Sequence, residues 1–134
     1  MNFTSLLKSL FGDKSSRDMK LIQPLVEQAK AKTPLVEVLD NDALRARVQE
    51  IRANIQAAAN EQKAKIAELK ATIEDTPIDE RADIFAQIDK LDKEALELYE
   101  VALNEAMPEV YAIVKETAKR FATNEDTVVT ANDF

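Results

Sequence analysis

The sequence contains a single glycine, Gly12, and neither histidine nor cysteine. A loop that cradles a phosphate needs several glycines, because backbone N–H groups have to converge on the anion. Histidine is the commonest general base and metal ligand, and cysteine supplies the thiolate nucleophile. The composition therefore excludes nucleotide-binding loops, zinc sites, thiol chemistry and Ser-His triads from this chain, and we expect it to hold no catalytic residue, cofactor or metal.

Aromatic residues are also scarce, at 5%, so the hydrophobic fraction of 46% consists mainly of Ala, Leu, Ile and Val. Together with 32% charged residues, this composition is typical of long helices and predicts an all-α fold with one modest core. No apolar run approaches the roughly 20 residues that span a bilayer. The lack of cysteine fits a reducing compartment, so a cytoplasmic location is expected.

The charge is unevenly distributed along the chain. Residues 1–32 contain six basic and three acidic residues, whereas the remainder contains 12 basic and 22 acidic ones, an acidic body that argues against binding nucleic acid. Residues 1–12 have helical apolar spacing and are predicted to form an amphipathic helix, either packed on the core or contacting a membrane or a partner. The expected membrane-contact residues are Phe3, Leu6, Leu7, Lys8, Leu10, Phe11 and Lys14.

Residues 16–39 are predicted to form a helix kinked at Pro24, a break at Thr33-Pro34 and then a single turn. The acidic group Asp40-Asn41-Asp42 follows. It could begin a calcium loop, but no glycine comes after it, and an apolar period starts at once. A helix N-cap is therefore the favoured interpretation.

Residues 41–107 are predicted to form a long, coiled-coil-like helical hairpin. Apolar residues recur every three or four positions without Gly or Pro, which predicts one helix about 50 Å long, ended by Thr76-Pro77. A second amphipathic helix must then fold back antiparallel to bury the facing stripe. The two stripes are Leu44, Val48, Ile51, Ile55, Ala58, Gln62, Ile66, Leu69 and Ile73, and Ile84, Ile88, Leu91, Ala95, Leu98 and Ala102. The dense carboxylates of residues 79–92 lack the histidines of di-metal bundles and indicate a solvated face.

A further helix is predicted at residues 108–122, with Pro108 at its first position. Its expected buried face comprises Val110, Ile113, Val114, Thr117 and Phe121. Residues 123–134 are predicted to be an extended tail whose stretch 127–130 has strand character. A lone strand pairs between copies, is disordered, or has partners further along a longer polypeptide. Met1 is typical of a natural start and Phe134 of an arbitrary stop, so we expect the front end of something larger.

Four stretches of the chain resemble, in order, the beginning of the SecA family, the ATP-driven motor of bacterial preprotein export. They are residues 6–12, 17–20, 39–51 and 107–120. The last is the most specific, because a hydrophobic residue precedes a sequence similar to Pro-Glu-Ala-Phe-Ala-Val-Val-Arg-Glu-Ala-Ala-Lys-Arg. Val110 stands there for Ala and Tyr111 for Phe. Typical members have only a short connection in place of residues 54–104, which resemble an insert carried by some members.

The resemblance implies an N-terminal segment that is non-catalytic alone and ends before the family's nucleotide motifs. ATP and Mg²⁺ would then belong to the parent protein, and residues 123–134 would be the truncated start of a nucleotide-binding domain. The implied partners are the remainder of the motor, the membrane channel and anionic lipid, at the cytoplasmic face of the inner membrane. We also expect the isolated chain to self-associate. The alternative is a free-standing helical scaffold that uses its hairpin for protein–protein interaction.

Overall fold

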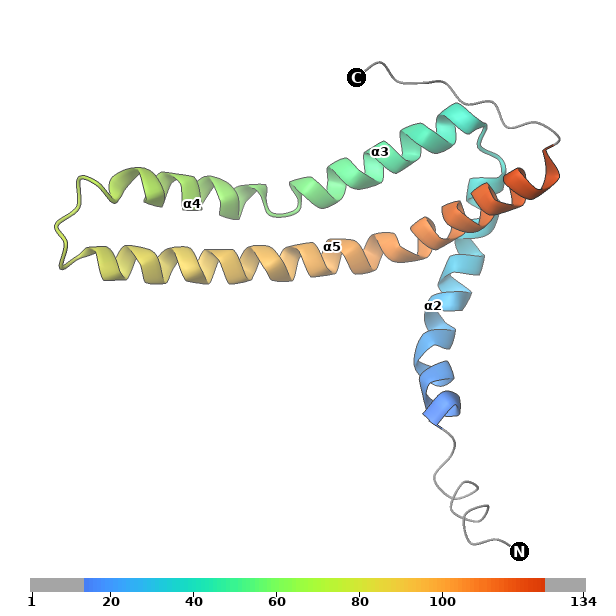
Figure 1. Ribbon diagram of the computed structural model, residues 1–134, viewed down its shortest axis with the longest axis horizontal. Helices are drawn as coiled ribbons and strands as arrows, with labels where there is room; N and C mark the ends of the chain where they lie inside the picture. Colours follow the sequence, from blue (N-terminus) through green and yellow to red (C-terminus); the bar gives the residue numbers. More distant parts are fainter. Residues whose placement is uncertain (1–13, 125–134) are drawn as a thin grey trace, which may run out of the picture. The chain divides into compact units, whose positions relative to one another are not determined.

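The computed structural model describes residues 14–124, with side chains from residue 16 onward. It confirms the all-α class, since helices hold 87% of the described residues and no strand occurs among them. The helices are α2 (Lys14–Glu37), α3 (Asn41–Ala57), α4 (Asn60–Thr72) and α5 (Arg81–Thr123), as Figure 1 shows. The helix expected at residues 1–12 and the strand expected at residues 127–130 lie outside the described residues.

Contacts along the chain divide it into two compact units, which are described separately. The central unit is Asp40–Met107 and contains α3, α4 and the first part of α5. The terminal unit combines Met1–Leu39 with Pro108–Phe134, of which α2 and the last part of α5 are described.

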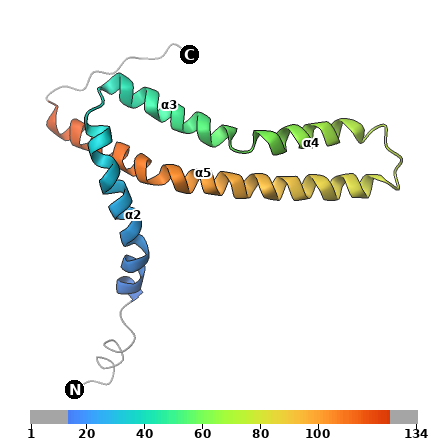
Figure 2. The ribbon, with the colours of Figure 1, turned by 180° about the vertical axis from the view of Figure 1, so that it is seen from behind.

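Helices α3 and α4 run antiparallel to α5 in the central unit, and both views of the ribbon show them side by side (Figures 1 and 2). The hydroxyl of Tyr99 donates to the carbonyl of Gln56 at 3.5 Å, and Lys63 Nζ lies 5.1 Å from the centre of the Tyr99 ring. Further along, residues 65–72 of α4 and 87–94 of α5 line one shallow groove. All nine stripe residues between Leu44 and Ile73 are buried or half-buried, so the sequence period identified this core face correctly.

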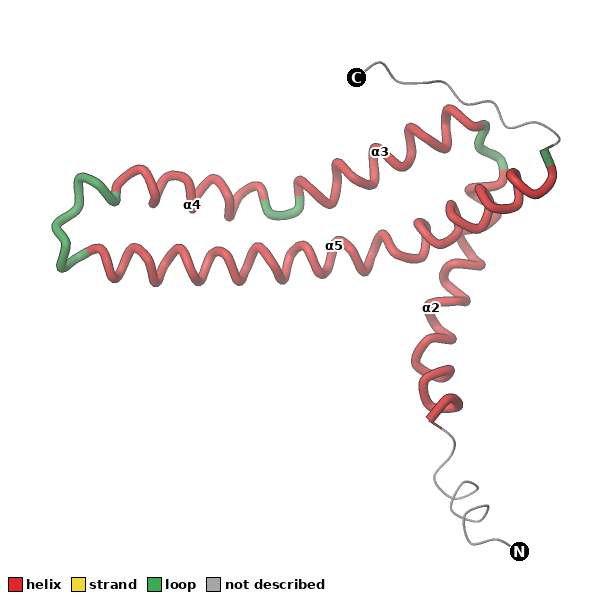
Figure 3. Tube along the Cα trace, in the orientation of Figure 1, coloured by secondary structure: helices red, strands yellow, loops and turns green. Residues whose placement is uncertain are grey.

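The single helix predicted through Leu44 and Ile73 is wrong, because α3 ends at Ala57 and α4 begins at Asn60 (Figure 3). At the break, Ala59 has φ −116° and ψ 21° and is completely buried. Carbonyls in the last turn of a helix lack intrahelical partners. At this break the Tyr99 hydroxyl donates to the backbone carbonyl of Gln56, which lies in the last turn of α3. The pattern could not show this break, since alanine is the strongest helix former and apolar spacing continues through it.

The ends of these helices are fixed by local hydrogen bonds. Asp40 caps α3 as expected, since its Oδ1 accepts from the backbone N–H of Ala43 at 2.7 Å. The expectation that Thr76-Pro77 ends the preceding helix is wrong by one turn, because α4 already ends at Thr72. The connection to α5 is held by Arg81, which donates from Nε to the Thr76 carbonyl at 2.9 Å and from Nη2 to the Glu74 carbonyl at 3.2 Å.

Two helix boundaries predicted from proline are also wrong. Helix α2 continues through Pro34 to Glu37, and α5 continues through Pro108, so no separate helix begins there. An interior proline removes one backbone hydrogen bond and strains the preceding turn. Tertiary packing outweighs that cost, because Val36 on the last turn of α2 is only 1% exposed and Pro108 itself is buried.

Candidate functional site

The terminal unit has a small core and turns a different face of α5 inward than the sequence predicts. Among its described residues the buried ones are Val36, Pro108, Ala112, Ile113 and Glu116. The prediction was right for Ile113 but wrong for Val110, Val114 and Phe121, whose side chains are exposed. Apolar residues lie on two sides of this helix, so spacing alone could not select the side that meets α2.

A polar cluster, called the clasp below, joins the end of α2 to the end of α5. It consists of Glu37, Leu39, Glu116, Lys119 and Arg120. Arg120 donates from Nε to Glu116 Oε1 at 2.8 Å and from Nη2 to the Leu39 carbonyl at 2.6 Å. Lys119 Nζ donates to Glu37 Oε1 at 2.9 Å and lies 3.8 Å from Glu116 Oε2. The clasp thus ties residues about 80 positions apart in the sequence.

The two shortest ion pairs of the clasp, Arg120–Glu116 and Lys119–Glu37, differ in burial. The Glu116 side chain is 7% exposed, and its charge is stabilised mainly by the Arg120 guanidinium, which donates to it at 2.8 Å. Glu37 and Lys119 are largely open to solvent. Their hydrogen bond nevertheless lowers the pKa of Glu37 from the usual 4.5, and it raises the pKa of Lys119 from the usual 10.5. The sequence signal that could have revealed the buried pair is the four-residue spacing of Glu116 and Arg120.

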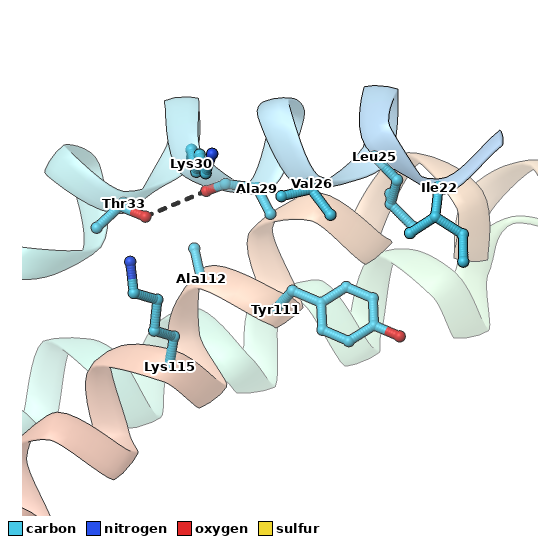
Figure 4. Close-up of a pocket in the computed structure, with 9 residues that line it drawn as sticks. All are labelled: Ile22, Leu25, Val26, Ala29, Lys30, Thr33, Tyr111, Ala112 and Lys115. Atoms are coloured by element: carbon cyan, nitrogen blue, oxygen red, sulfur yellow. Dashed lines mark hydrogen bonds between the residues drawn. The ribbon is translucent and has the colours of Figure 1, made fainter. Parts of the chain in front are cut away.

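A groove with a volume of about 450 Å³ lies beside the clasp, between α2 and the last part of α5 (Figure 4). Its walls are mainly aliphatic, and Tyr111 is the one aromatic side chain in the lining. The lining residues are Ile22, Leu25, Val26, Ala29, Lys30, Thr33, Tyr111, Ala112 and Lys115. The hydroxyl of Thr33 donates back to the Ala29 carbonyl at 3.2 Å, so it adds little polarity to the groove. The size and lining suit an apolar side chain or helix.

Exposed apolar side chains continue from the groove over both helices of the terminal unit. Ten large ones are exposed among its described residues, more than the unit buries. They are Met19, Leu21, Ile22, Val26, Leu35, Val38, Val110, Tyr111, Val114 and Phe121. An apolar surface of this extent is typical of a region that packs against another protein surface.

The membrane-contact residues predicted from the sequence are not tested by this structure. Six of them, from Phe3 to Phe11, lie outside the described residues, and Lys14 is the first residue of α2. Within residues 14–124, no group of three or more acidic side chains is arranged to hold a metal ion. None of the helices described is both long and apolar enough to cross a membrane.

The sequence matches curated protein translocase subunits over its whole length. The SecA proteins of Bacteroides fragilis, Phocaeicola vulgatus and Parabacteroides distasonis are 52%, 51% and 47% identical to it over all 134 residues. The chain spans only 12% of the length of each of these relatives. Because the match includes residues 54–104, that insert is not peculiar to this chain.

No family model matches the sequence, and no solved structure matches it. The similarity to SecA therefore rests on the curated relatives alone. A match over the whole chain but only 12% of each relative fits an N-terminal segment. Along its whole length the chain is therefore similar to an N-terminal segment of SecA protein translocase subunits.

Proposed function

We propose that the chain is the N-terminal part of a SecA-like ATP-driven motor that exports preproteins across the inner membrane. The observation that carries this proposal is the identity of up to 52% to SecA along all 134 residues. In this proposal the chain contributes no catalytic group. ATP and Mg²⁺ bind elsewhere in the parent protein, because a single glycine cannot build a phosphate loop.

The terminal unit then serves as a brace for the rest of the motor. The unit has an apolar groove, and among its described residues the exposed large apolar side chains outnumber the buried ones. The remainder of the parent protein is therefore the natural partner of this surface. The clasp keeps α2 and the last part of α5 in fixed register, which gives the brace a defined shape. The amphipathic residues 2–11 would contact anionic lipid or the membrane channel at the cytoplasmic face.

A chimera tests this function directly. The matching segment of Bacteroides fragilis SecA is replaced by this chain, and ATP-dependent import of a preprotein into inverted inner-membrane vesicles is measured. We expect import by the chimera, and none by a version that lacks the segment. A chimera that folds and hydrolyses ATP but imports nothing would contradict the proposal.

Two further measurements separate the parts of the proposal. Calorimetry of the isolated chain with ATP and Mg²⁺ should show no saturable binding, because the nucleotide motifs are absent from its sequence. In vesicle co-sedimentation, deletion of residues 2–11 should reduce binding to anionic vesicles and leave binding to neutral vesicles unchanged. Equal binding by both forms would remove membrane contact from the proposed function but keep the brace.

A further inference from the structure

One side of α5 in the central unit carries apolar and acidic residues that are exposed to solvent. The residues are Phe85, Asp89, Asp92, Leu96, Glu100 and Leu103, called the acidic seam below. At 100° per residue they fall within an arc of about 80°, and they extend for about 27 Å along the helix. All six are exposed, with Leu96 68% exposed.

The spacing of the acidic seam is that of a helix-pairing surface. Five of its members, Phe85, Asp89, Asp92, Leu96 and Leu103, fall at a and d positions of one heptad register, and Glu100 falls at the flanking e position. The core stripe that faces α3 and α4, with Ile88 and Ala95 buried, lies on a neighbouring side of the same helix. Helix α5 therefore has a second surface suited to another helix.

The carboxylates of the acidic seam decide which helix fits. Asp89, Asp92 and Glu100 make no hydrogen bond or ion pair with any residue in the described part of the chain. A second copy does not suit them, because a centred antiparallel pairing of two seams places Asp89 against Glu100. A parallel pairing places each carboxylate against its own copy, and an anionic membrane would repel all three.

The charge of the whole central unit favours a cationic partner as well. Residues 40–107 contain 16 acidic and nine basic residues, a net charge of −7, which equals the net charge of the full chain. A unit of this charge attracts positively charged segments over a Debye length before contact is made. The seam then offers apolar contacts that a purely solvated acidic surface would lack.

We propose that the acidic seam docks a basic amphipathic helix of another protein. Lysine or arginine side chains of that helix would lie opposite Asp89, Asp92 and Glu100, and its apolar side chains opposite Phe85, Leu96 and Leu103. The central unit is then a recruitment arm that recognises its partner by pairing two amphipathic helices, as in a coiled coil. This inference is independent of the motor function, because it concerns binding by the chain alone.

The test uses the full chain and a fluorescent 18-residue helical peptide that repeats leucine and lysine at a and d spacing. Binding is followed by anisotropy at low and high salt, with a peptide that carries glutamate in place of lysine as the control. The seam variant is D89N/D92N/E100Q. The matched variant E97Q/E105Q/D75N removes the same charge from exposed positions outside the seam.

We expect the seam variant to weaken binding about tenfold and the matched variant to weaken it less than about threefold, since only the seam pairs are formed on docking. Leu96→Ser should also weaken binding, whereas Val101→Ser, on another side of α5, should not. Equal loss in both charge variants would show unspecific attraction and overturn the proposal. So would the absence of peptide binding, or dimerisation of the chain that the seam variant abolishes.

Discussion

At the scale of single residues, the clasp joins the ends of α2 and α5 through one buried and one exposed ion pair. Glu116 is nearly inaccessible and depends on Arg120, whereas Glu37 and Lys119 meet in solvent. An exposed ion pair contributes little to the free energy of unfolding. That contribution can still be recognised, because it changes with pH as the two groups titrate. The lowered pKa of Glu37 and the raised pKa of Lys119 define the two ends of that range.

Glu37→Gln should lower stability at neutral pH and cease to matter at both pH extremes. Ionised Glu37 stabilises the fold above its unfolded pKa of about 4.5, and this contribution disappears as the pH falls through the lowered folded pKa. The contribution of Lys119 is complete below about 10.5 and disappears as the pH rises through the raised folded pKa. The urea midpoints of native chain and variant should therefore differ at pH 7 and converge once the pH falls below the lowered folded pKa of Glu37.

The matched control is Glu27→Gln, which removes a carboxylate of the same helix whose partner, Lys30, is only three residues away. Urea unfolding of both variants is followed by helical circular dichroism across the pH range. Identical pH profiles for the two variants would mean that the bond between α2 and α5 has no special part in stability.

At the scale of elements, Pro34 and Pro108, two of the three prolines inside the described helices, destabilise helices that tertiary packing maintains. Pro34 is exposed and Pro108 is buried, although both lack the N–H that would complete the helix ladder. Pro34→Ala should therefore raise the free energy of unfolding by as much as about 3 kcal/mol. Pro108→Ala should raise it less, because the lost packing of the buried ring offsets part of the gain.

Chemical denaturation of the three proteins gives this comparison, with the unchanged denaturant slope as the check on two-state behaviour. A loss of stability in Pro34→Ala would contradict the account. It would mean that the proline at this position stabilises the chain through its restricted unfolded state instead.

The elements also show what the sequence could predict. Apolar spacing identified the core face of α3 and α4 correctly, because burial follows the helical period even where the helix is interrupted. The break at Ala59 and the continuity through Pro108 depend on contacts with distant residues, which no local pattern contains. The clasp was missed for the same reason, since Glu37 and Lys119 are brought together by the fold alone. The groove could not be predicted either, because apolar spacing did not decide which side of α5 faces α2.

At the scale of the whole molecule, the two units have different surface chemistry. The central unit accounts for the full net charge of −7, whereas the sequence of the terminal unit contains nine basic and nine acidic residues. The terminal unit combines this neutrality with ten large apolar side chains that are exposed among its described residues. Repulsion therefore keeps the central units of two copies apart, and nothing comparable protects the terminal units.

The isolated chain should for this reason self-associate through its terminal unit. Sedimentation equilibrium at about 100 μM should give a mass above the 15.0 kDa of one chain, because unpartnered apolar surface of this extent finds a second copy. V114S/F121S should weaken association about tenfold by removing two of the exposed side chains. L96S/L103S makes a comparable change on the central part of the same helix and should leave association unchanged, because carboxylates surround these leucines. A monomer at this concentration, or equal effects of the two variants, would contradict this prediction. The exposed apolar side chains of the terminal unit would then not mediate contact between copies.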